Sequence, residues 1–117
     1  MQDYKDLKVW EKGHALTLKV YSITKMFPKE EMYALSSQMR RSASSIPMNI
    51  AEGCGRIGNK EFAHFCDIAI GSSNELEYQL ILAKDLKYIG LKRFTDLTEL
   101  VVEIRKMLFS FVKKLKK

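Results

Sequence analysis

The sequence predicts an all-α fold, an antiparallel up-down-up-down four-helix bundle that occupies residues 1–117 as a single domain. Apolar residues recur at steps of three and four along nearly the whole chain, which is the period of a helix rather than of a strand. The two prolines and six glycines cluster mainly at three breaks, near residues 27–29, 53–59 and 88–91. Four segments remain, and their short connections make successive helices antiparallel.

The first segment, near residues 6–26, has two apolar faces, which predicts that neighbours cover it on two sides. The second, near residues 30–52, has one apolar seam and contains Pro47, which should kink the helix or remove one backbone hydrogen bond. The faces of the first segment are formed by Leu7, Trp10, Leu18 and Tyr21, and by Val9, Leu16, Val20, Ile23 and Phe27.

The third segment, near residues 60–89, follows Asn59, a residue favoured at the N-cap of a helix. Its middle, residues 71–74, is small and polar, so another helix could approach closely there. The fourth segment, from Phe94 to Leu115, keeps an unbroken apolar stripe that is wider than one seam requires. We expect part of this surplus to face a partner chain. The surplus consists of Leu100, Val102, Met107, Phe109 and Val112.

A polar stripe runs along the second segment beside its apolar seam. It is either a binding groove or a satisfied polar network that fixes register, and we favour the network. Antiparallel pairing about the loop near residue 56 places Arg41 opposite Glu75 and predicts a charge-assisted contact between them. Glu75→Ala should then destabilise the fold more than Glu77→Ala. The predicted network comprises Gln38, Arg41, Ser45, Asn49, Glu52, Ser72 and Glu75.

The chain carries a formal net charge of +6, from 20 Lys and Arg against 14 Asp and Glu. A basic balance favours anionic partners such as nucleic acid. The lysines at the C-terminus could contact phosphates, or they could compensate the dipole of the last helix. The candidate nucleic-acid-binding residues are Arg40, Arg56, Lys60, Lys106, Lys113, Lys114, Lys116 and Lys117.

Two short motifs mimic catalytic or cofactor sites. Residues 53–58 match the glycine pattern of dinucleotide-binding loops, but that pattern works only after a strand. We interpret the run as the end of a helix and a turn that needs positive φ. Glu61 and His64 form half of a di-iron pattern, and Glu11 and His14 form a second copy near another segment start. The further inward glutamates are missing from the pattern, so we expect no metal, no cofactor and no enzymatic activity.

Cys54 and Cys66 form no metal-ligand pattern, and two thiols in a chain with a sizeable core indicate a reducing compartment. The first ten residues are polar and lack the apolar stretch of a signal peptide. No apolar run approaches the roughly 18 residues of a membrane span. We therefore expect a cytoplasmic protein without membrane contact.

Several motifs resemble those of a known family. They are Leu7-Lys8-Val9-Trp10, Ser45-Ile46 followed by Asn49-Ile50-Ala51-Glu52-Gly53, Glu61-Phe62-Ala63-His64-Phe65, and Gly71-Ser72 followed by Glu75-Leu76. They are similar to those of the bacterial four-helix bundle proteins of the 23S ribosomal RNA intervening-sequence type, over nearly the whole chain.

The resemblance implies an antiparallel bundle, often assembled as a homopentamer, with no catalytic residues to carry over. A related branch, the accessory variability determinant of diversity-generating retroelements, is a pentameric barrel that binds nucleic acid and a reverse transcriptase. We therefore expect a non-enzymatic homo-oligomer that binds RNA or DNA, as a scaffold or chaperone. The alternative is a protein–protein adaptor with no nucleic-acid role.

Overall fold

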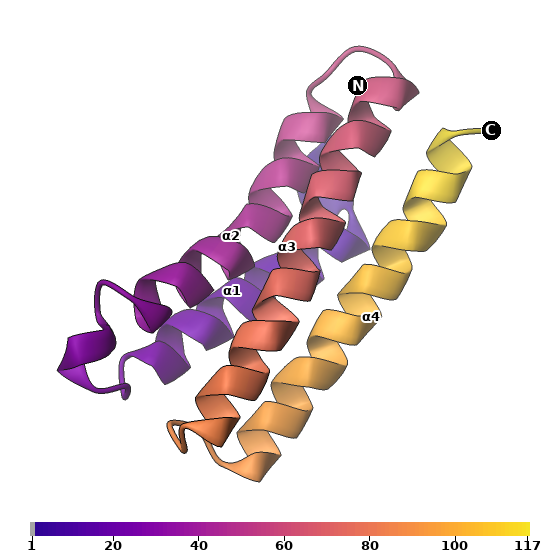
Figure 1. Cartoon of the computed structure of the whole chain (residues 1–117). Helices are drawn as coiled ribbons and strands as arrows, with labels where there is room; N and C mark the ends of the chain where they lie inside the picture. The colour runs from indigo at the N-terminus through magenta and orange to yellow at the C-terminus, as the bar shows by residue number, and fades with distance from the viewer. Residues whose placement is uncertain (1) are drawn as a thin grey trace.

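The computed structural model describes residues 2–117 and consists of four long helices in an antiparallel up-down-up-down bundle of 44 × 23 × 20 Å (Figure 1). The predicted fold class is confirmed. Two short 3₁₀ turns precede the first and second helices. The helices are α1 (Lys8–Thr24), α2 (Leu35–Cys54), α3 (Asn59–Asp85) and α4 (Leu91–Leu115), and the turns are η1 (Tyr4–Asp6) and η2 (Lys29–Glu31).

Each helix packs on the next one in the chain, and α4 returns to α1 to close the bundle. The contacts are richest between α2 and α3 and sparsest between α1 and α4. The core is continuous along the bundle and is filled by the predicted seams. Its fully buried side chains include Leu16, Val20, Met39, Ile46, Ile50, Leu76, Leu80, Val101, Ile104 and Leu108.

The start of α2 differs from the prediction by five residues. Residues 30 and 31 belong to η2, and α2 begins only at Leu35. The Glu31 carboxylate accepts hydrogen bonds from the Leu35 backbone N–H at 3.4 Å and from the Tyr88 hydroxyl at 2.8 Å. Glu31 thus satisfies one of the free N–H groups of the new helix and ties this turn to the loop between α3 and α4.

Both ends of α3 also differ from the prediction. Gly58, at φ 89°, is the N-cap, and Asn59 is the first helical residue, so the expected Asn59 cap is wrong. The helix ends at Asp85 because Lys87 adopts a left-handed φ of 66°. The Tyr88 N–H then donates to the Ala83 carbonyl at 2.9 Å, a bond typical of helix termination.

The two apolar faces predicted for α1 have different surroundings. Val9, Leu16, Val20, Ile23 and Phe27 are buried in the core, as the sequence analysis expected. On the other face the side chains of Leu18 and Tyr21 are exposed. Within this chain only one side of α1 is therefore fully covered. In a bundle of four helices, each helix keeps one side that faces away from the core.

The apolar surplus of α4 is largely accounted for within the chain. Val112 is buried, and Leu100 and Met107 are partly buried against the core. Val102 is half-buried. The Phe109 side chain remains 55% exposed and is the part of the surplus that could face a partner chain.

Candidate nucleic-acid interface

One end of the bundle brings together the start of α1, the loop between α2 and α3, and the end of α4 (Figure 1). The rings of Phe62, near the start of α3, and Phe111, near the end of α4, pack edge to face with centroids 5.1 Å apart. Leu7 and Lys8 line one groove together with Phe111 and Lys114. Three regions that are distant in the sequence therefore form one surface.

Lysines in or next to all three of these regions are exposed and have no salt bridge anywhere in residues 2–117. The last turn of α4 contains two of them, and the chain continues with two more. Because no carboxylate neutralises them, these charges remain available to an anionic partner. We call the surface the basic end, and it comprises Lys8, Arg56, Lys60, Lys113, Lys114, Lys116 and Lys117.

Arg56 is the one predicted residue of the basic end that is already engaged. Its Nε donates to Glu52 Oε2 at 3.0 Å, and its guanidinium lies 5.0 Å from the centroid of the Phe65 ring. Both members of the ion pair are about half exposed. An exposed pair of this kind contributes little to stability, so breaking it would cost the fold little.

Acidic side chains are also present near this end. Asp3 pairs with Lys5, and Asp6 and Glu61 are exposed. Asp3 caps η1, Asp6 ends η1 just before α1, and Glu61 lies in the first turn of α3, where negative charge compensates the helix dipole. The excess charge of the surface is nevertheless positive.

Two predicted nucleic-acid-binding residues lie away from the basic end. Arg40 donates from Nε to Thr24 Oγ1 at 2.8 Å and packs over the Tyr21 ring at 4.9 Å. Thr24 is the last residue of α1, so Arg40 lies at the opposite end of the bundle, roughly 24 Å away at 1.5 Å per residue. Lys106 is exposed about two turns before the lysine tail.

Lys8 is absent from the nucleic-acid-binding residues predicted from the sequence. This lysine opens α1, is exposed, and lines the same groove as Lys114. No local pattern marks it, because its basic neighbours come from the other end of the chain. Lys8 lies in the basic end only because α4 packs back against α1.

The polar stripe forms part of the predicted network. The hydroxyls of Ser45 and Ser72 lie 2.8 Å apart and join α2 to α3. Asn49 Nδ2 donates to the Ser45 carbonyl at 2.7 Å and contacts Ser45 Oγ at 2.9 Å. Glu52 pairs with Arg56 instead of joining this cluster. Hydrogen bonds therefore link Ser45, Asn49 and Ser72 at the centre of the stripe.

The predicted Arg41–Glu75 contact is not formed within the chain. Glu75 Oε1 instead accepts a hydrogen bond from Ser42 Oγ at 3.0 Å. Successive residues of a helix are about 100° apart, so Ser42 faces α3 while Arg41 is exposed on the outer side of α2. Gln38 is exposed as well. A contact of Arg41 with Glu75 of another copy remains a prediction.

The glycine-rich run joins two helices rather than a strand and a helix. Gly58 supplies the positive φ that the sequence analysis expected, whereas Gly53 lies inside α2. A Cβ at position 53 would lie 2.8 Å from Phe62 Cδ1 and 2.9 Å from Phe65 Cβ. Gly53 is therefore required for the close approach of α2 and α3.

The groups that could perform chemistry are dispersed or buried. Burial raises the pKa of the Cys66 thiol to about 12, which keeps it protonated and unreactive. His14 stacks on Trp10 and His64 packs against Phe65, both at the surface. Among residues 2–117, no three His, Cys, Asp or Glu side chains are grouped closely enough to hold a metal ion. The same part of the chain contains no helix long and apolar enough to span a membrane.

A family model for the 23S rRNA-intervening sequence protein matches residues 5–110. The chain belongs to that family. Membership confirms the resemblance drawn from the motifs. A similar solved structure is the crystal structure of a protein with unknown function from the S23 ribosomal protein family of Bacteroides thetaiotaomicron. It is 28% identical, with a TM-score of 0.83, and the match covers 90% of this chain and 95% of that one. A search of curated proteins gave no match.

Proposed function

We propose that this member of the 23S rRNA-intervening sequence protein family is a non-enzymatic, oligomeric scaffold that binds RNA or DNA through its basic end. The observation that carries the proposal is the convergence of Lys8, Lys60 and the C-terminal lysines on one surface without salt-bridge partners in residues 2–117. Dipole compensation alone explains cations in the last turn of α4. It does not explain Lys8, which lies at the start of a helix, where a cation is disfavoured.

Oligomerisation would multiply this charge. The exposed apolar side chains of Leu18, Tyr78 and Phe109 provide surface for contacts between copies. A pentamer, which the family resemblance favours, would carry about +30, five times the formal +6 of one chain. Repeated weak phosphate contacts on one particle strengthen binding through multivalency. A cytoplasmic location and, by analogy with the retroelement branch, a reverse transcriptase partner belong to the same proposal.

The test is an electrophoretic mobility shift with labelled RNA and DNA at several salt concentrations. We expect affinity to fall steeply with salt, because binding releases counterions from the phosphates. Replacing Lys113, Lys114, Lys116 and Lys117 by Gln should weaken binding to every sequence and flatten the salt dependence.

The matched control removes four lysines nearer the other end of the bundle, which are exposed and have no salt bridge in residues 2–117. It leaves the same net charge, so it separates the basic end from overall charge. If both variants bind alike, or the wild-type protein binds nothing at low salt, the basic end is not a nucleic-acid interface. The control residues are Lys19, Lys25, Lys29 and Lys87.

A second candidate function is that of a protein–protein adaptor, and the exposed apolar side chains favour it. Leu18, Ile68, Tyr78 and Phe109 lie on the surfaces of three different helices. Light scattering of the purified protein, followed by pull-down after nuclease treatment, distinguishes the two functions. A monomer that keeps a protein partner after nuclease treatment would support the adaptor.

A further inference from the structure

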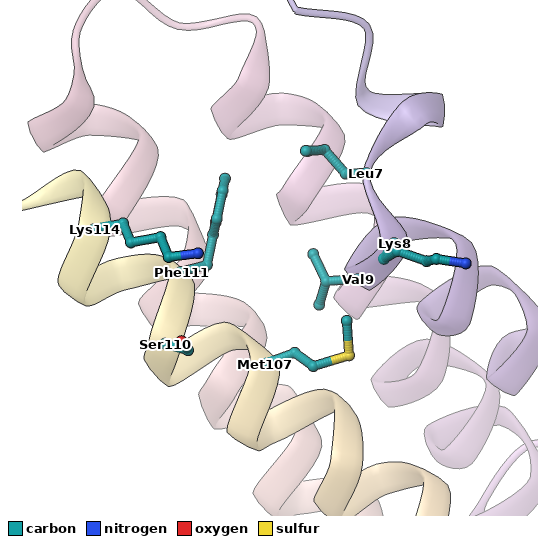
Figure 2. Close-up of a pocket in the computed structure, with 7 residues that line it drawn as sticks. All are labelled: Leu7, Lys8, Val9, Met107, Ser110, Phe111 and Lys114. Carbon is teal, nitrogen blue, oxygen red and sulfur yellow. The ribbon is translucent and has the colours of Figure 1, made fainter.

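The seam between α1 and α4 is open at the basic end. These two helices share fewer contacts than any other adjacent pair, and a groove of about 240 Å³ lies between them (Figure 2). Leu7 and Val9 form one wall of the groove, and Met107 and Phe111 come from α4 on the other side. The groove is therefore lined mainly by apolar side chains and lies within the basic end.

The Phe111 ring is oriented for stacking. Figure 2 shows the ring edge-on, with one face turned across the groove toward Leu7 and Val9. The edge-to-face contact with Phe62, at an interplanar angle of 78°, holds the ring in this orientation. A flat, apolar group could enter parallel to the ring and contact the aliphatic wall with its other face.

A lysine side chain lies on each side of the groove. The Lys114 side chain extends toward Phe111, and Lys8 extends outward from α1 on the opposite side (Figure 2). Both are exposed, and neither has a salt bridge in the described chain. The ligand that matches this arrangement is flat and apolar at its centre and anionic on both flanks.

We propose that the groove takes one unstacked base of a single-stranded nucleic acid, with the neighbouring phosphates on Lys8 and Lys114. This inference rests on the proposed function and narrows its substrate class. A base within a duplex is stacked on both faces and cannot reach the ring, whereas a single strand can place a base on an aromatic side chain. The basic end then binds single strands more tightly than duplexes of equal length.

A second groove in the same seam supplies the control. It lies farther along α1 and α4 and is lined by six residues, none of them aromatic. Two cations, Lys19 and Arg93, also line this groove, and its carboxylate, Asp96, forms a salt bridge with Lys92 at 3.3 Å, so the second groove is basic but offers no ring for stacking. The lining residues are Lys19, Ser22, Ile23, Arg93, Asp96 and Leu97.

The experiment compares the affinity of the full-length protein for a short oligonucleotide containing 2-aminopurine, as a single strand and as a duplex. Phe111→Leu keeps apolar volume but removes the ring, and Ser110→Leu narrows the groove from its exposed rim without adding a ring. We expect each to lower single-strand affinity about tenfold, the magnitude of one lost base stack. Duplex affinity should change less than twofold, and the fluorescence change on binding should disappear.

Ser22→Leu, in the second groove, is the matched control and should leave both affinities unchanged. Thermal melts identify any variant that fails to fold. Because Ser110 is exposed, Ser110→Leu should fold normally, and it still tests the groove if Phe111→Leu does not fold. Equal affinity of the wild-type protein for single strands and duplexes would overturn the inference while leaving the proposed function intact. Absence of all binding would overturn both. A shift in oligomer size in Ser110→Leu, without a fluorescence effect, would instead show that a second copy of the chain covers the groove.

Discussion

The Thr17 hydroxyl on α1 lies 3.1 Å from the Ala43 carbonyl on α2. This carbonyl is the one that Pro47, which lacks an N–H, leaves without its normal donor four residues later. The single hydroxyl proton of Thr17 is shared with the Gly13 carbonyl of its own helix, which lies 2.8 Å from Oγ1. Gly13 in turn allows the approach, because a Cβ there would lie 3.2 Å from Ile46 Cγ2. The neighbouring helix thus compensates for the proline within α2.

Thr17→Val should therefore destabilise the protein by about 1–3 kcal/mol, the cost of leaving a buried acceptor unsatisfied. Thr17→Ser keeps the hydroxyl and is the matched control. In a Pro47→Ala background the backbone N–H returns, so the penalty of Thr17→Val should shrink. Urea unfolding of the four proteins in this cycle measures the coupling. A penalty of equal size in both backgrounds would mean that the hydroxyl does not serve the Ala43 carbonyl.

Of these two carboxylates of α3, Glu77 should contribute more to the stability of the fold than Glu75. Its Oε1 lies 2.7 Å from Arg105 Nη1, and the two side chains are only 31% and 19% exposed. Glu77→Ala removes a charged hydrogen bond and should cost about 1.5–3 kcal/mol. Glu75→Ala removes only the bond from Ser42 and should cost about 0.5–1.5 kcal/mol. Thermal melts decide the order, which is the reverse of the one expected from the sequence.

Two glycines should respond oppositely to alanine. At Gly53 the new Cβ would collide with Phe62 and Phe65, so Gly53→Ala should destabilise by about 1–3 kcal/mol despite its better helix propensity. At Gly71 nothing lies within 4 Å of the Cβ position. Gly71→Ala should stabilise by about 1 kcal/mol, the propensity gain. Chemical denaturation measures both changes, and stabilisation by both would contradict the close approach at Gly53.

Within the chain α2 makes the expected close approach to residues 71–74, because Ser45 Oγ lies 2.8 Å from Ser72 Oγ. Gly71→Ala tests whether a partner copy also approaches this segment from the outer side. Within the chain Gly71 is exposed and no helix covers it. If a partner copy packs there, the added methyl group would disturb that interface. Sedimentation velocity would then show a smaller species, together with a loss of stability rather than a gain.

The Tyr88–Glu31 hydrogen bond should make stability sensitive to alkaline pH. The bond to Glu31, with burial as a smaller cause, raises the pKa of Tyr88 above its ordinary value of about 10. Because the folded protein holds the phenol proton more tightly, this contribution is complete below pH 10. It is lost as pH rises through the folded pKa.

Tyr88→Phe lacks the bond at every pH. The stability difference between the two proteins should therefore be constant up to about pH 9 and should narrow above pH 10. Urea unfolding from pH 8 to pH 11 measures this difference. A difference that stays constant to pH 11 would mean that Tyr88 ionises alike in the folded and unfolded chains.

Local periodicity determined much of this protein. Apolar residues at steps of three and four fixed the helices and their buried faces, and the breaks near Pro28, Gly58 and Gly90 fixed the connections. These features depend on neighbours within a few residues, which any single sequence displays. The family motifs, in contrast, coincide with contacts between helices, because Ser45 Oγ lies 2.8 Å from Ser72 Oγ of α3 and Gly53 allows the close approach of α3.

The tertiary structure alone decided which polar side chains meet. Glu75 accepts a hydrogen bond from Ser42 rather than contacting Arg41. Successive residues of α2 point about 100° apart, so Ser42 faces α3 while its neighbour Arg41 faces outward. Likewise, Lys8 and Lys114 line the same groove only because α4 packs back against α1. Sequence periodicity defines the faces of each helix, whereas the packing of separate helices determines the partners of each side chain.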